Sequence, residues 1–205
     1  MTQLRHLDLS GNPLDVIPPL SFYNLTSLRS LNLKYMTCLE SIDRHAFSDV
    51  TSLKIVDLSF SPHLKLIDET AFTFTSTGAK IELDSFYARQ TGLETLSQAL
   101  LRWDYVNEVD LAENPWHCDC RLIWMRDVIN MDSSDGKLRC QSPERLEGRL
   151  INKLNIADMC SNLKTLPLLA GGGVTIMYIK LRSRKTTMYT GLKERFTYNA
   201  STADE

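Results

Sequence analysis

The sequence predicts an α/β solenoid, in which each repeat adds one short strand to a parallel concave sheet and a cysteine-rich segment closes the C-terminal end. Two observations predict this fold class. Aliphatic residues recur with one internal spacing in five successive segments, and four of the five cysteines follow residue 117. The 205 residues are 43% hydrophobic and 23% charged, a globular composition that excludes a largely disordered, collagen-like or multi-span membrane protein.

The repeats are recognised by their leucines. The first has the form LxxLxLxxNxL, and these positions are filled by Leu4, Leu7, Leu9, Asn12 and Leu14. The five repeats begin 24, 25, 25 and 28 residues apart, at Leu4, Leu28, Leu53, Gly78 and Val106. The fourth is eroded, because Gly78 takes the first leucine position and only Ile81 and Leu83 follow in register. The pattern resembles the leucine-rich repeat, whose period is about 20–29 residues.

The LxL step has a mechanical meaning. Alternate side chains of a strand point to one face, so each repeat turns its leucines inward, and a fixed period stacks the strands in parallel. No single repeat closes a core alone. We expect three phenylalanines at matching positions to pack behind the strands from the convex side: Phe22, Phe47 and Phe72.

The asparagine position is filled in only two repeats, by Asn12 and Asn114. The resemblance implies that this side chain bonds backbone groups where the chain turns away from the strand. In the three middle repeats, Met36 or Thr37, Ser61 and a residue near Tyr87 stand there instead. We therefore expect irregular turns in those repeats.

The chain changes character at residues 114–120, NPWHCDC, which are followed by Cys140 and Cys160. This segment resembles the cysteine-rich C-terminal flanking module of extracellular leucine-rich-repeat proteins. The resemblance implies a right-handed solenoid whose last repeat is covered by a disulfide-bonded cap. It also implies two pairs, Cys118 with Cys140 and Cys120 with Cys160, in an oxidising compartment.

A zinc site is the competing hypothesis for the four cysteines and His117. Zinc sites favour two residues between paired cysteines, and Cys118 and Cys120 are separated by one. The spacing favours disulfides, and we predict no metal and no cofactor. The fifth cysteine, Cys38, is expected to be a buried thiol that fills the vacant asparagine position of its repeat, and the alternative is a reactive or intermolecular thiol.

We divide the chain into four parts: repeats in 1–113, the cap in 114–160, a membrane-proximal segment in 161–185 and a short tail in 186–205. Residues 165–179 are free of charge and precede a basic cluster, which is typical of a single-pass anchor. The alternative is an apolar extension packed on the surface of a secreted protein. Because Met1 lies three residues before a repeat leucine, without a signal segment, we expect a fragment whose front is missing.

Charge excludes one class of partner. Residues 1–160 carry 16 basic and 22 acidic side chains, net −6, and residues 161–205 carry 7 and 3, net +4. An acidic body offers no continuous surface for a phosphate backbone, so we predict no nucleic-acid binding. Asn24 begins an Asn-Leu-Thr glycosylation acceptor, and Asn199 begins another that an anchor would place in the cytoplasm.

The candidate ligand-binding residues are the polar side chains that flank the strand leucines on the concave face. They form an acidic ladder beside a basic one: Arg5, His6, Asp8, Arg29, Asn32, Lys54, Asp57, Lys80, Glu82, Glu108 and Asp110. Such ladders steer a protein partner. The alternative is that these charges only solvate the face, because exposed ion pairs are individually worth less than about 1 kcal/mol.

Motifs for catalysis are absent: the sequence has no GxSxG, no HExxH and no glycine-rich phosphate loop. We predict a non-enzymatic recognition protein of the cell surface, a receptor or adhesion molecule that binds a protein ligand on its concave face. Two alternatives remain open at this stage. One is a secreted matrix or inhibitor protein without an anchor, and the other is an intracellular scaffold.

Overall fold

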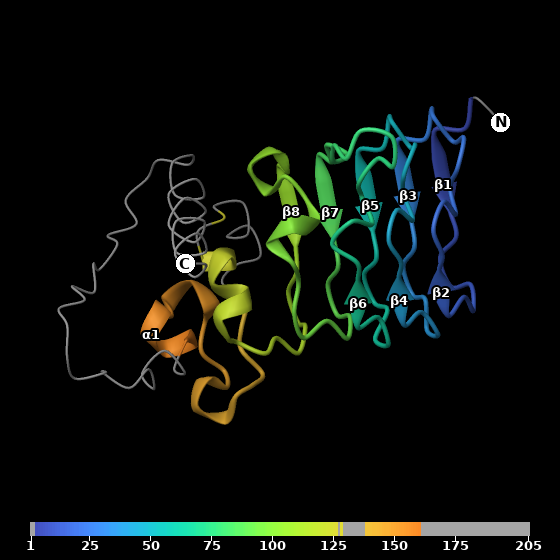
Figure 1. Cartoon of the computed structure of the whole chain (residues 1–205). Helices are drawn as coiled ribbons and strands as arrows, with labels where there is room; N and C mark the ends of the chain where they lie inside the picture. Colours follow the sequence, from blue (N-terminus) through green and yellow to red (C-terminus); the bar gives the residue numbers. More distant parts are fainter. Residues whose placement is uncertain (1–2, 127, 129–137, 161–205) are drawn as a thin grey trace, which may run out of the picture. The chain divides into compact units, whose positions relative to one another are not determined.

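Five short parallel strands form the larger sheet, and their order in the sheet is their order in the chain (Figure 1). They are β1 (His6–Asp8), β3 (Ser30–Asn32), β5 (Ile55–Asp57), β7 (Ser85–Tyr87) and β8 (Glu108–Asp110). A smaller parallel sheet of three strands contains β2 (Val16–Ile17), β4 (Ser41–Ile42) and β6 (Leu66–Ile67). The structure is a computed structural model that describes residues 3–126, 128 and 138–160.

The middle residue of each strand in the larger sheet points into the core, because successive side chains of a strand alternate between faces. These residues lie opposite one another in register: Leu7, Leu31, Val56, Phe86 and Val109. From Leu31 onward they are at most 2% exposed, and Leu7 in the edge strand is partly buried. The predicted solenoid with a parallel sheet is confirmed.

The predicted position of the fourth strand is wrong. The leucine spacing placed it around Ile81 and Leu83, whereas Ser85 pairs with Ile55 and Phe86 takes the inward position. The step from Ile55 to Ser85 is therefore 30 residues, and the next step, to Glu108, is 23.

A short hairpin causes this shift. Thr73 and Lys80 form an antiparallel bridge, and Gly78, with a φ of +68°, donates its N–H to the Phe74 carbonyl at 2.9 Å. The hairpin inserts residues before the strand. The aliphatic side chains that follow the hairpin, Ile81 and Leu83, are still buried, at 2% and 1% exposure. They therefore fit the leucine spacing of the repeats without being part of the sheet.

The turns after the five strands share one conformation, so the expectation of irregular turns in the middle repeats is wrong. The third residue after each strand has a positive φ, between 52° and 74°. These residues are Gly11, Tyr35, Phe60, Gln90 and Glu113. Only the first is glycine, and the neighbouring repeats impose the left-handed conformation on the other four.

Side chains at the asparagine position bond the turn in different ways. Asn114 donates its amide to the carbonyls of Ala88, at 2.7 Å, and Leu111, at 2.9 Å. Among the described residues, the Asn12 side chain bonds the Leu9 carbonyl alone, at 2.7 Å. In the third repeat the buried Ser61 hydroxyl accepts the Met36 N–H at 3.2 Å. The predicted backbone-bonding role of the two asparagines is confirmed.

The expectation for Cys38 is wrong. Cys38 is an exposed free cysteine, and Met36, two residues earlier, is the buried side chain of that turn, at 0% exposure. Met36 is the longer and more apolar side chain, so burying it removes more apolar surface from water.

Aromatic rings form a continuous row through the core. Phe47 stacks on Phe22 and Phe72, with ring centroids 5.5 and 4.4 Å apart. The row continues edge-to-face through Phe86 to Trp103. The ring centroid of Trp103 lies 4.9 Å from that of Trp124 in the cap. The predicted packing of the three phenylalanines behind the strands is confirmed, and the two tryptophans extend it into the cap.

The cap is held by two disulfides, Cys118–Cys140 and Cys120–Cys160, which are the pairs that the resemblance implies. Its chain also continues the ladder of the repeats, because the His117 N–H donates to the Glu94 carbonyl at 2.8 Å. Trp116 is fully buried and donates its indole N–H to the Leu111 carbonyl at 3.2 Å. The cap thus covers the last repeat with both backbone and side-chain contacts.

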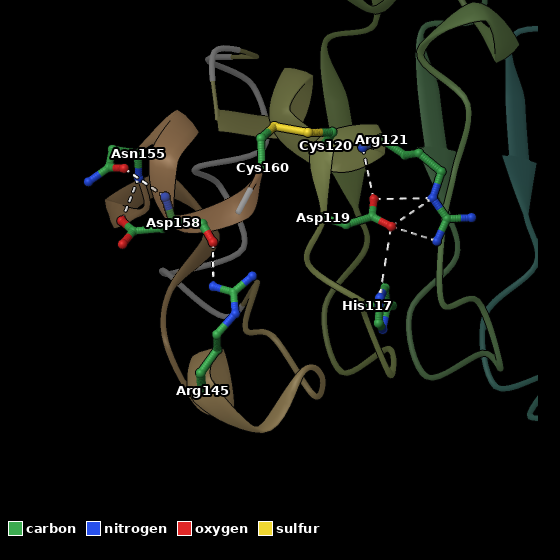
Figure 2. Close-up of a disulfide and its surroundings, with 8 residues drawn as sticks. All are labelled: His117, Asp119, Cys120, Arg121, Arg145, Asn155, Asp158 and Cys160. Carbon is green, nitrogen blue, oxygen red and sulfur yellow. Dashed lines mark hydrogen bonds and ion pairs between the residues drawn. A yellow bond between two sulfur atoms is a disulfide. The ribbon is translucent and has the colours of Figure 1, made fainter. Parts of the chain in front are cut away.

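In the part of the chain that the structure describes, the helices are short. They are η1 (Gln98–Leu100), η2 (Trp103–Tyr105), η3 (Cys120–Arg126), η5 (Glu144–Leu146), η6 (Ile151–Lys153) and α1 (Ile156–Met159). A reciprocal capping box begins α1: Asn155 accepts the Asp158 N–H at 2.8 Å, and Asp158 accepts the Asn155 N–H at 2.9 Å (Figure 2). The capping box fixes the N-terminal end of α1, and Cys160 of the second disulfide is the residue directly after its C-terminal end.

Within the described ranges no helix is long and apolar enough to cross a bilayer. The predicted anchor 165–179, the segment 161–185, the tail 186–205 and the Asn199 acceptor all lie outside the described residues. The same described ranges hold no group of three or more His, Cys, Asp or Glu side chains that could bind a metal ion.

Candidate protein-binding face

The larger sheet presents two columns of outward side chains, because the first and third residues of each strand flank the inward one. We call these ten residues the strand face: His6, Asp8, Ser30, Asn32, Ile55, Asp57, Ser85, Tyr87, Glu108 and Asp110. A third column precedes the strands and consists of Arg5, Arg29, Lys54, Asp84 and Asn107. The structure brings nine of the eleven predicted ligand-binding residues into these columns.

Lys80 and Glu82 are the two exceptions, and their predicted place in the columns is wrong. Lys80 lies in the hairpin, where its ammonium group donates to the carbonyl of Leu100 at 3.4 Å and to that of Ala99. Burial lowers the pKa of Lys80. Glu82 pairs with Arg102. Ser85 and Tyr87 stand in the sheet instead, because the hairpin shifts the strand.

The third-residue column has a structural task. In four strands its side-chain oxygen accepts the N–H two residues further on, at 2.9 Å for Asp8, 3.2 Å for Asn32, 3.0 Å for Asp57 and 3.0 Å for Asp110. Such Asx turns end the strand. One oxygen of each aspartate is therefore committed to the fold, and the other remains for contacts across the sheet.

Contacts across the sheet already neutralise most of the acidic groups. Three ion pairs form, with these distances between the side-chain nitrogen and the carboxylate oxygen: Lys34–Asp57 3.8 Å, Lys54–Asp84 3.4 Å and Arg89–Asp110 3.5 Å. The phenol of Tyr87 donates to Glu108. Burial and this bond raise the pKa of Tyr87.

The first two repeats differ from the rest. Within the described part of the chain, the guanidinium groups of Arg5 and Arg29 have no hydrogen-bond or ion-pair partner. They lie at neighbouring register positions, since Arg29 donates its backbone N–H to the Arg5 carbonyl at 2.8 Å. The N-terminal end of the columns is therefore basic and free to bind, and the C-terminal end is acidic and paired.

An aromatic pair of one exposed and one half-buried ring borders the strand face at the turns. Tyr35 and Phe60 stack with ring centroids 4.9 Å apart, and Tyr35 is 53% exposed. Sequence reasoning missed this pair. Its signal was available, because both residues are third after their strands and therefore neighbours in register. Exposed aromatic side chains on a rigid frame are frequent anchors of protein interfaces.

The glycosylation acceptor Asn24 is exposed, with a φ of 65°, in the loop that follows Phe22. This position leaves the side chain open to modification. Its glycosylation stays a prediction.

Comparison with known proteins agrees with the repeats. The family model described as Leucine rich repeat matches residues 2–74. Residues 2–74 therefore match the leucine-rich-repeat pattern. SLIT and NTRK-like protein 5 of Mus musculus and of Homo sapiens is 36% identical over 64 residues, which are 30% of this chain and 7% of that protein. Trophoblast glycoprotein of Macaca fascicularis is 24% identical over 163 residues, 78% of this chain.

This chain covers a small part of those relatives, 7% of the first and 26% of the second. Among solved structures, human 5T4 (trophoblast glycoprotein) matches 76% of this chain and 87% of its own, with 20% identity and a TM-score of 0.34. A chain of the complex of Latrophilin 3, Unc5D and FLRT2 matches with 26% identity and a TM-score of 0.45, over 77% of this chain and 55% of its own.

Proposed function

We propose that this chain is the recognition module of an extracellular protein and binds a protein ligand through the strand face. The observation that carries the proposal is the combination of the free basic groups of Arg5 and Arg29, before the strands, with the exposed Tyr35 ring stacked on Phe60, after the strands. Charged side chains steer a partner toward a surface, and exposed aromatic rings supply contact area once it docks. The ladder beneath is buried and hydrogen-bonded, so the surface is preorganised.

The two disulfides support an extracellular location, because such bonds persist in oxidising compartments. We infer that the protein is displayed at the cell surface, with residues 165–179 as its anchor. Carbonate extraction of the expressed chain tests this: retention in the membrane fraction is expected. Release, or a glycan on Asn199, would favour the secreted alternative.

The binding test uses a panel of purified extracellular domains as probes against the disulfide-bonded protein. For a probe that binds, we expect Arg5→Glu with Arg29→Glu to slow association and Tyr35→Ala to speed dissociation. Lys153→Glu, a charge reversal at the exposed last residue of η6 in the cap, is the matched control and should leave both rates unchanged. Equal loss in Lys153→Glu would place the ligand elsewhere on the molecule.

A further inference from the structure

The smaller sheet is built by one repeating pair of backbone hydrogen bonds. In β2 and β4, the residue before the strand and the last residue of the strand each accept, at the carbonyl, an N–H group of the next repeat. The bonds to β2 are Glu40 N–H to Asp15 O at 2.7 Å and Asp43 N–H to Ile17 O at 3.0 Å. The bonds to β4 are Lys65 N–H to Glu40 O at 3.0 Å and Asp68 N–H to Ile42 O at 2.9 Å.

The sheet stops at β6, and the equivalent carbonyls there are those of Lys65 and Ile67. No N–H group of residues 3–126, 128 or 138–160 donates to either of them. Beside them Leu66 is 58% exposed. An unpaired strand edge of this kind is a template for a further strand.

A cavity of about 480 Å³ lies beside this edge. Residues 65–69 line it from the third repeat, and residues 95–98 and Arg121 line it from the other side. The two repeats touch on either side of it. A Cβ at Gly92 would lie 2.6 Å from the Pro62 carbonyl oxygen, and the Ser97 hydroxyl donates to Glu69 at 2.9 Å. The fourth repeat thus leaves the sheet between residues 92 and 97, and the space beside β6 stays open.

We propose that this edge binds a short extended segment of a partner protein as a fourth strand. By the register of the sheet, the first and fourth residues of that segment donate their N–H groups to the Lys65 and Ile67 carbonyls. Its third residue takes the position equivalent to Ile42 and Ile67, which are 0% and 6% exposed, and is therefore apolar. Strand addition of this kind gains affinity from main-chain bonds and specificity from the inward side chain.

A second copy of this chain is disfavoured as the occupant. Head-to-tail stacking would place β2 of one copy on β6 of another. The residues of β2 in register with the donors Glu40 and Asp43 are Asp15 and Pro18. Proline has no N–H, so the copy could form one of the two bonds and not the other.

The probe is a fluorescein-labelled peptide with the sequence of residues 64–70, LKLIDET, which makes this pairing with β4 inside the molecule. We expect it to bind the disulfide-bonded protein with a dissociation constant below about 1 mM, measured by fluorescence polarisation. The matched peptide, N-methylated at the positions of Lys65 and Asp68, lacks both donors. It should bind about tenfold more weakly or worse.

Two variants complete the test. Thr95→Trp fills the cavity and should abolish peptide binding, and Thr51→Trp, the same change in an exposed loop outside it, should not. The proposal is overturned if the peptide does not bind with a dissociation constant below about 1 mM. It is also overturned if both peptides bind equally well, or if Thr95→Trp binds the peptide as the wild type does. A dimer in sedimentation that Thr95→Trp dissociates overturns it too, because the edge would then belong to a second copy. Binding to the strand face is unaffected by Thr95→Trp, so the two proposals fail separately.

Discussion

The repeats and the cap bury side chains of the same kind but hold them by different means. In the repeats each layer rests on its neighbours through an apolar row and a hydrogen-bonded turn, and the pattern recurs. In the cap the chain follows no repeat, and two disulfides tie together residues 22 and 40 positions apart. The difference teaches that repetition supplies stability only where a next layer exists. At the C-terminal end of the stack, where a cap replaces the next layer, two covalent bonds hold that cap together.

The largest expected loss of folding stability comes from a substitution in the repeats. Phe47→Ala removes a fully buried ring that stacks on both Phe22 and Phe72 and should destabilise the protein by about 3–5 kcal/mol. Urea denaturation followed by circular dichroism measures it. Tyr23→Ala, which removes a ring that is 66% exposed, is the control. A loss no greater than in this control would show that the aromatic row does not hold the layers together.

The next effect is in the cap. Replacing both Cys120 and Cys160 by Ser opens a loop of 40 residues and should cost about 2–4 kcal/mol. Hydrogen exchange should show the loss in residues 138–160 first, with the backbone amides of β3 and β5 still protected. Simultaneous loss of protection in these strands would mean that the cap and the repeats unfold as one unit.

The asparagine position gives a direct comparison of a buried and an exposed turn. Asn114 is 6% exposed and bonds three other residues, so Asn114→Ala should cost about 1–3 kcal/mol. Asn12 is exposed and bonds one carbonyl, so Asn12→Ala should cost less than about 1 kcal/mol. Thermal melting of both variants tests the order. Equal costs would contradict the role of burial.

The smallest expected effect is on how the stability of the folded protein depends on pH. The hydroxyl and N–H of Thr70 lower the pKa of Asp68 in the repeats, and the Asn155 N–H lowers the pKa of Asp158 in the cap. A lowered pKa in the folded state stabilises the protein above the unfolded value, near 3.8, and this contribution is lost as the pH falls through the folded value. Stability should therefore decline more steeply below about pH 4 in the wild type than in Asp68→Asn or Asp158→Asn.

Urea midpoints at a series of pH values measure this decline. The control is Asp15→Asn, because the carboxylate of Asp15 accepts no hydrogen bond from the described residues. A slope in Asp68→Asn that equals the wild-type slope would exclude Asp68 as a source of the acid sensitivity.

The sequence predicted the strands of four repeats because a buried face fixes register: the LxL step of Leu31 and Leu33, for example, has only one arrangement that hides both. The fourth strand could not be predicted in this way. Ile81 and Leu83 fit the leucine spacing of the repeats as well as Phe86 does. Only the pairing of β7 with β5 shows that Phe86 is the inward residue of the strand. Local periodicity does not contain that information.

Other features lacked a periodic signal altogether. Two-residue strands such as β4 are too short to show alternation, so the smaller sheet and its open edge were not predicted. The left-handed turns were hidden because Tyr35 and Phe60 stand where glycine is usual. For the binding face, the strand positions were predictable. Which charges are free was not, because Lys34 and Arg89, which neutralise two of the acidic groups, lie outside the strands.

The shared left-handed turn has an evolutionary consequence. At each of these positions the contacts of the neighbouring layers hold the backbone at a positive φ, and the identity of the residue does not. Glycine, tyrosine, phenylalanine, glutamine and glutamate therefore all occur there. Successive layers set these side chains about 4.8 Å apart. Mutation can therefore rewrite this row one residue at a time while the backbone stays unchanged, which is how a fixed scaffold acquires new specificities.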